Sequence, residues 1–175
     1  VYTCYPESAL FDECYAVEID CITDYEFEGN TLTNYFGRAS SVTLPECLRI
    51  TTIGPTAFKN NRSLKTIDLG ESIYAINDSA FFGCNKLQSV VNSEKVKRIG
   101  NNAFSNSTIA NIDISGAEVI GSSAFLNCTN ITNIVLIGKP EINTLVLNNS
   151  AFKNCTGLES ISYKGTLELD EEVFM

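Results

Sequence analysis

Cysteine is the residue whose chemistry could dominate this chain, because its 175 residues include 7 Cys and no His. Without His, a Ser-His-Asp triad, a Cys-His dyad and an imidazole metal site are all excluded. No Cys-x-x-Cys pair occurs, so the spacing does not favour zinc. No general base accompanies a Cys in a recognisable pattern, so a thiol nucleophile is not indicated. The sequence therefore predicts a protein without catalytic residues, metal ligands or a cofactor.

Acidic side chains are the second group that could do chemistry, since 21 Asp and Glu against 12 Lys and Arg give a net charge of −9. Asp68 and Asp113 are expected at equivalent places two repeat units apart, which corresponds to about 10 Å between stacked strands. Oxygen ligands lie about 2.4 Å from Ca²⁺, so the two carboxylates cannot share one ion, and they do not form a catalytic pair. The acidic balance argues against a nucleic-acid partner. The lack of an apolar run of about 18 residues argues against direct membrane insertion of this segment.

Asparagine offers a third possibility, because seven N-x-S/T sequons occur in the chain. Part of this number reflects the preference of repeat turns for Asn. Asn61 falls in a column that we expect to be buried, so it should stay unmodified. The predicted glycan acceptors, if the source organism glycosylates secreted proteins, are the four sequons expected on turns: Asn106, Asn127, Asn130 and Asn154.

An internal repeat positions all of these residues, and the dipeptide Ala-Phe marks it most clearly. The Ala residues of five copies are separated by 23, 23, 21 and 27 residues, and Val173-Phe174 is a degenerate sixth copy. An aliphatic residue lies five residues before each Phe. Repeats of about 20–50 residues are typical of solenoid architectures. The five Phe residues of the complete copies are Phe58, Phe81, Phe104, Phe125 and Phe152.

Each repeat unit is expected to contain one strand, a turn and one short α or 3-10 helical turn. The strand is predicted from an L-x-x-I-x-L stretch whose last part alternates with period two. The helical turn is predicted because a residue that favours an N-cap (Gly, Asn or Asp) stands four residues before each Phe. The column three residues after Phe is interpreted as a packing ladder of small side chains: Asn61, Cys84, Ser107, Cys128 and Cys155.

The chain is expected to form a single solenoid domain over residues 1–175. Residues 50–175 hold regular repeats of about 23 residues, the last of them incomplete, and residues 1–49 are interpreted as divergent N-terminal or capping repeats. Because the chain begins without Met and stops after a turn signal, the natural protein is expected to continue beyond it. A disulfide between two of Cys4, Cys14 and Cys21 is the hypothesis for stabilising the N-terminal cap.

Residues 120–136 follow the pattern I-G-x-x-A-F-x-x-C-x-x-L-x-x-I-x-L, with Ile131 at the first Leu position. This pattern resembles the BspA-type leucine-rich repeat, also called the Treponema pallidum type. The resemblance covers residues 50–175 well and residues 7–49 loosely. It implies a right-handed leucine-rich-repeat solenoid of α/β repeats, with a parallel β-sheet on the concave face and short helical or 3-10 turns on the convex side. It also implies a secreted or cell-surface protein implicated in adhesion.

The concave face of such a solenoid is the predicted binding surface. Along each strand, alternate residues point into the core and toward the exposed face, so equivalent exposed positions form columns across neighbouring strands. The side chains of these columns are short and mostly polar, and they include no aromatic cluster of the kind that anchors tight interfaces. The first column contains Thr66, Ser89, Asn111, Asn133 and Ser160, and the second contains Asp68, Val91, Asp113, Val135 and Ser162.

Two functions remain open at this point. The first is a non-enzymatic binding module that mediates adhesion to host cells, to a matrix protein or glycan, or to other microbes. The alternative is a structural repeat segment, either a spacer stalk or a subunit of a self-assembling filament, with self-association in place of a foreign partner. For either function, the resemblance implies an extracellular location, secreted or at the cell surface.

Overall fold

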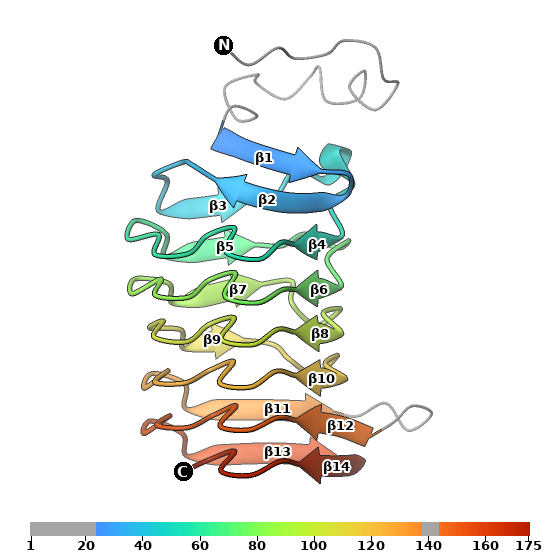
Figure 1. Ribbon diagram of the computed structural model, residues 1–175, viewed down its shortest axis with the longest axis vertical. Coiled ribbons are helices and arrows are strands. Elements are labelled where there is room, and N and C mark those ends of the chain that lie inside the picture. Colours follow the sequence, from blue (N-terminus) through green and yellow to red (C-terminus); the bar gives the residue numbers. More distant parts are fainter. Residues whose placement is uncertain (1–23, 138–143) are drawn as a thin grey trace.

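A computed structural model describes residues 24–137 and 144–175, apart from the side chains of Cys47, Ile137 and Lys164. The chain winds through successive turns that stack along one axis, from β1 at one end to β14 at the other (Figure 1). Strands of successive repeats pair in parallel, which confirms the expected parallel-strand solenoid.

The predicted L-x-x-I-x-L strands form one row of the solenoid. Strands β3 (Ser41–Thr43), β5 (Thr66–Asp68), β7 (Ser89–Val91) and β9 (Asn111–Ile112) make a four-stranded parallel sheet. Strands β11 (Asn133–Ile137) and β13 (Ser160–Lys164) make a separate two-stranded parallel sheet. The row is therefore interrupted once, between β9 and β11, within the part of the chain that the structure describes.

A second row of strands runs beside the first and was not predicted. Its eight strands are β1 (Tyr25–Glu28), β2 (Thr31–Tyr35), β4 (Thr52–Ile53), β6 (Ala75–Ile76), β8 (Arg98–Ile99), β10 (Val119–Ile120), β12 (Thr144–Leu147) and β14 (Thr166–Leu169). The hairpin β1–β2 is antiparallel, and the remaining pairs are parallel. The aliphatic residue five positions before each Phe lies at or near the end of these strands. Four strands of this row, β4, β6, β8 and β10, span only two residues. A segment that short cannot show the period-two alternation by which a strand is recognised in a sequence.

The Ala-Phe segments are turns, and the structure does not confirm the expected α or 3-10 turns there. Every second N–H of these segments donates to a carbonyl of the next repeat, as the Phe58 N–H does to Ala80 O at 2.8 Å. The intervening N–H groups donate within the turn, as the Lys59 N–H does to Thr56 O at 2.9 Å. The one 3-10 helix of at least three residues in the described ranges is η3 (Glu46–Leu48).

Left-handed residues explain why these segments do not continue as helices. The residues two positions before and two positions after Phe all have positive φ, which lets the chain alternate between bonds inside the turn and bonds to its neighbour. Small or amide-bearing residues occupy nearly all of these places, as the left-handed region favours. The positions are Thr56, Ser79, Asn102, Ser123, Ser150 and Glu172 before Phe, and Asn60, Gly83, Asn106, Asn127 and Asn154 after it.

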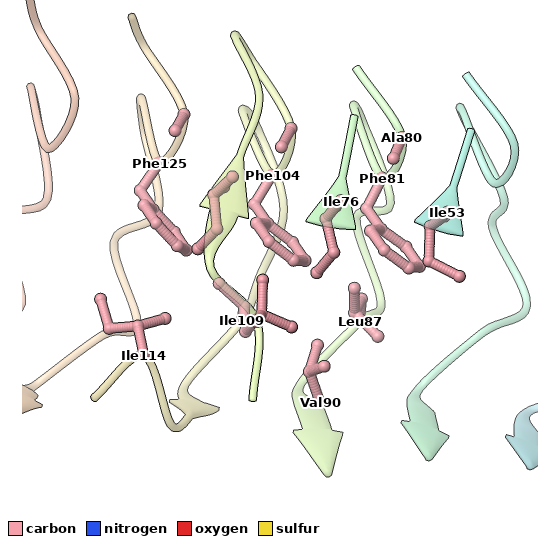
Figure 2. Packing of buried hydrophobic residues seen from close by; sticks show 14 of the residues in the cluster. Ile53, Ile76, Ala80, Phe81, Leu87, Val90, Phe104, Ile109, Ile114 and Phe125 are labelled. Carbon is pink, nitrogen blue, oxygen red and sulfur yellow. The ribbon is translucent and has the colours of Figure 1, made fainter. Parts of the chain in front are cut away.

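The core is a continuous stack of aromatic rings along the solenoid axis. The rings of Phe81 and Phe104 have centroids 5.1 Å apart and planes within 2°, and Phe104 and Phe125 are 5.2 Å apart. Figure 2 shows these rings facing one another, with the aliphatic side chains of Leu87 and Ile109 packed beside them. Burial of these side chains is the main force that holds the repeats together.

Candidate recognition face

Nine of the ten residues of the predicted binding surface lie on the first row of strands, and the tenth, Asp113, directly follows β9. Within each sheet the register matches the expected columns. In the first sheet Thr66 pairs with Ser89, and Ser89 pairs with Asn111. In the second sheet Asn133 pairs with Ser160. Thr66, Asp68 and Ser89 are half-buried, and the other seven side chains are exposed. We call this surface the polar face: the exposed side of β5, β7, β9, β11 and β13, together with Asp113, which directly follows β9.

The interruption between β9 and β11 divides the polar face. The third complete repeat is one residue short, since Ile109 follows Phe104 by five positions where the corresponding residue follows by six in the other copies. Strand β9 is accordingly only two residues long. The Asp113 N–H, just beyond it, donates to Ser93 Oγ at 3.0 Å rather than extending the strand. A single missing residue thus coincides with a local break in the ladder.

Backbone groups at this break lack the partners that equivalent groups have. The carbonyl of Gln88 accepts hydrogen bonds from two N–H groups of the next repeat, Ala110 at 2.9 Å and Asn111 at 3.0 Å. The carbonyls of Lys65 and Thr132 likewise each accept two backbone hydrogen bonds from the repeat that follows. The Ala110 carbonyl is the equivalent acceptor at the break. Among the described residues it accepts no such pair from the following repeat.

A groove of ≈ 440 Å³ lies on the polar face at this break. Four predicted binding residues line it: Val91, Asn111, Asp113 and Asn133. The other six predicted residues lie outside the groove lining. The remaining lining residues, which the sequence analysis did not single out, are Val90, Asn92, Ser93, Ala110, Ile112 and Thr132. The signal that could have revealed the groove is the short third repeat.

The two predicted columns of the polar face carry negative charge. Asp68 Oδ1 accepts bonds from the Gly70 N–H at 2.9 Å and from Asn92 Nδ2 at 2.7 Å, so this carboxylate helps to order the turn after β5. Asp113 Oδ1 accepts the Ser115 N–H at 2.8 Å, and its carboxylate is exposed. The two predicted columns contain these two Asp residues and no Lys or Arg. Across residues 24–137 and 144–175, no group of His, Cys, Asp and Glu is arranged to hold a metal ion.

The three described thiols of the small-residue column are buried and free. Each donates to the carbonyl of the preceding repeat's Phe; Cys84 Sγ lies 3.0 Å from Phe58 O, and Cys128 Sγ lies 3.1 Å from Phe104 O. Burial raises the pKa of the Cys84 thiol to about 12 and that of Cys128 to about 11. Such thiols are poor nucleophiles near neutral pH. The disulfide hypothesis for Cys4, Cys14 and Cys21 falls outside the described residues.

The four predicted glycan acceptors lie on the turns, and three of them form a side-chain ladder. Asn127 Nδ2 donates to Asn106 Oδ1 at 2.7 Å, and Asn154 Nδ2 donates to Asn127 Oδ1 at 2.9 Å. Asn130 Nδ2 donates to the Thr108 carbonyl at 3.3 Å. Asn106 differs from the other three, because its Nδ2 donates to Oγ of the adjacent Ser105. The side-chain nitrogen of Asn106 therefore makes its hydrogen bond within its own repeat.

Repeated L-x-x-I-x-L strands stacked in parallel over a shared apolar core define a leucine-rich-repeat solenoid. The model of the BspA type leucine rich repeat region matches residues 51–175 in six copies, and the chain belongs to this family. Repeats of this type serve as protein-interaction modules. No curated protein matches the sequence.

Solved bacterial structures share the fold. A leucine rich cell surface protein of Faecalibacterium prausnitzii A2-165 aligns with a TM-score of 0.67 and 25% identity, over 81% of this chain and 38% of that protein's chain. The T. pallidum leucine-rich-repeat protein aligns with a TM-score of 0.59 and 18% identity, over 85% and 84% of the two chains. A leucine-rich-repeat protein of Eubacterium ventriosum gives 0.58 and 20%, over 83% and 45%. This chain therefore spans less than half of the first and third of these proteins.

Residues 24–137 and 144–175 contain no helix with the length and apolar character needed to cross a bilayer.

Proposed function

We propose that this chain is a non-enzymatic binding module of a secreted or cell-surface protein and that its polar face mediates adhesion to host cells, matrix proteins or other microbes. The observation that carries the proposal is the alignment of short side chains in register within each of the two sheets of the first row; of the ten predicted residues, seven are exposed. A flat array of this kind presents a broad surface, and a specific interface needs about 800 Å² per partner. The cell-surface description of the F. prausnitzii relative supports an extracellular location.

The proposed partner is a host or matrix protein or a glycan. The polar face suits a moderate, reversible interaction, because its exposed positions are mostly Ser, Asn and Asp with two Val and no aromatic anchor. Adhesion through many copies on a cell surface does not need high affinity at each copy, since multivalency raises the overall strength of attachment.

The test compares two matched double variants of the full chain. Asn111→Arg with Asn133→Arg places two bulky cations on the polar face, whereas Thr52→Arg with Thr166→Arg makes the same charge change on the other row of strands. Both proteins are immobilised, and capture of host-cell surface proteins and matrix components is measured with the unmodified chain as reference.

The proposal predicts that the polar-face variant loses saturable binding by about tenfold, equivalent to 1.4 kcal/mol, and that the control variant changes it by less than about twofold. Equal binding by both variants would show that the polar face is not the adhesive surface. If the unmodified chain instead assembles with itself in light scattering, and the polar-face variant does not, the structural alternative replaces adhesion.

A further inference from the structure

The groove between β9 and β11 has features that the rest of the polar face lacks, and they point to one kind of ligand. We infer that this groove binds an extended basic peptide segment, with an Arg or Lys side chain of the peptide paired to Asp113 and the peptide backbone bonded to the unpaired backbone groups at the break. This inference deepens the proposed function and rests on it, because it names the part of the polar face and the class of partner.

Backbone complementarity is the first argument. The Thr132 and Asn133 N–H groups occupy the positions that donate to the preceding carbonyl in other repeats, as Glu159 N does to Thr132 O at 2.8 Å. At the break they make no such bond to the Ala110 carbonyl, so the groove presents donors from one strand and an acceptor from the other. An extended peptide offers an alternating series of C=O and N–H groups, and it can satisfy both sides at once.

Charge is the second argument. Asp113 is exposed at the groove, and its Oδ1 is held by the Ser115 N–H while no bond is made to Oδ2 among the described residues. The lining contains no Lys, no Arg and no second carboxylate, so one anionic site faces an otherwise neutral polar surface. A guanidinium or ammonium group matches this site, and Arg adds a planar pair of donors that fits a carboxylate. An acidic peptide would place like charges together.

The shape and lining of the groove are the third argument. Its volume of ≈ 440 Å³ falls within the range of about 300–1,000 Å³ that is usual for ligand sites. Its side chains are short, so a backbone can approach the strands closely. Val91, 40% exposed, lines the groove and offers apolar contact for an alternate side chain of the peptide. No aromatic ring lines the groove, which disfavours a sugar stacked on a ring.

The test uses the full chain, labelled with ¹⁵N, and two short probes. The basic probe is acetyl-Ser-Val-Arg-Val-Ser-amide, and the matched acidic probe replaces Arg with Glu. Amide chemical shifts are followed during titration at low salt. We expect the basic probe to bind in the millimolar range and to shift the amides of Thr132, Asn133 and Asp113 first. We expect the acidic probe to leave them unchanged, and added salt to weaken binding of the basic probe.

Two matched charge variants assign the contact. Asp113→Asn keeps the Oδ1 acceptor for the Ser115 N–H, so it preserves the local turn while removing the charge, and it should weaken the basic probe about threefold to fivefold. Glu168→Gln removes one charge from exposed β14 on the other row and should leave binding unchanged. Equal binding of both probes, equal loss in both variants, or shifts confined to other surfaces would overturn the inference.

A third variant tests the backbone argument. Insertion of one Asn between Thr108 and Ile109 restores the spacing of the other repeats, and it is expected to pair β9 with β11 and abolish probe binding. If the amide spectrum shows this pairing and the probe still binds, the inference is wrong; if the insertion prevents folding, the two charge variants decide. One outcome separates this inference from the proposed function. If the Asn111→Arg, Asn133→Arg variant loses adhesion to the partner but the basic probe does not bind the unmodified chain, peptide binding at the groove is refuted and the proposed function stands.

Discussion

Removal of one ring from the aromatic stack tests how the repeats hold each other together. Phe104 is fully buried and lies between Phe81, with centroids 5.1 Å apart, and Phe125, with centroids 5.2 Å apart. Phe104→Ala removes the buried ring, leaves a cavity and breaks two stacking contacts. Substitutions of this kind cost about 3–5 kcal/mol, and the two lost aromatic contacts place the expected cost near the upper end, at about 4–5 kcal/mol.

The assay is urea unfolding followed by circular dichroism, with Phe36→Ala as the control. Phe36 is 56% exposed, so its replacement should change the free energy of unfolding by less than about 0.5 kcal/mol. Phe174 stacks on one neighbour, Phe152, and is 42% exposed, so Phe174→Ala should cost much less than Phe104→Ala. A loss below about 1 kcal/mol for Phe104→Ala, or equal losses at Phe104 and Phe174, would refute the view that the stack carries the core.

Three further predictions concern the thiols, the break in the ladder and the turns. Cys84 and Cys128 should resist iodoacetamide at pH 8 in the native protein and react after unfolding. Burial raises the pKa values of these thiols above the ordinary value of 9.0 only in the folded state. Their contribution to stability should therefore be complete below pH 9 and be lost between about pH 9 and 12; a rise in stability there, or rapid native labelling, would contradict this. The amides of Thr132 and Asn133 should exchange hydrogen at least about tenfold faster than those of Glu159 and Ser160, which donate to the Thr132 carbonyl; equal rates by NMR would mean that the break closes in solution. In a eukaryotic secretory host, peptide mass spectrometry should find glycan at Asn106 before Asn127, whose Nδ2 bonds to Asn106 Oδ1, and the reverse order would contradict the role of the ladder.

The repeat made much of the fold predictable. Recurrence of Ala-Phe and L-x-x-I-x-L predicted parallel stacking, the strands of the first row and the burial of Phe58 through Phe152, because each unit must bury the same apolar positions against its neighbours. The small-residue column was interpreted as a packing ladder, and Cys84 and Cys128 are buried there, each bonded to a carbonyl of a preceding repeat.

Local backbone geometry was harder to predict from the sequence. Strands such as β4 and β6 are two residues long, and their pairing depends on neighbouring repeats rather than on their own sequence. The residues four before Phe resemble N-caps, yet left-handed residues such as Thr56 and Asn60 turn the chain toward the next repeat. The groove lies at the repeat that is one residue short before Ile109, and the effect of such a shortening on β9 and β11 depends on pairing between repeats. Side-chain patterns report burial well, but they do not report which backbone groups find partners.

Cross-saturation NMR with a bound partner tests the central claim most directly. A deuterated, ¹⁵N-labelled chain is mixed with a captured host or matrix protein, and saturation of the partner's protons is transferred to amides at the interface. The account predicts intensity loss at polar-face amides such as Thr66, Asn111 and Asn133, and none at Thr52, Arg98 and Val119 of the other row. Loss confined to Thr52, Arg98 and Val119 would contradict it.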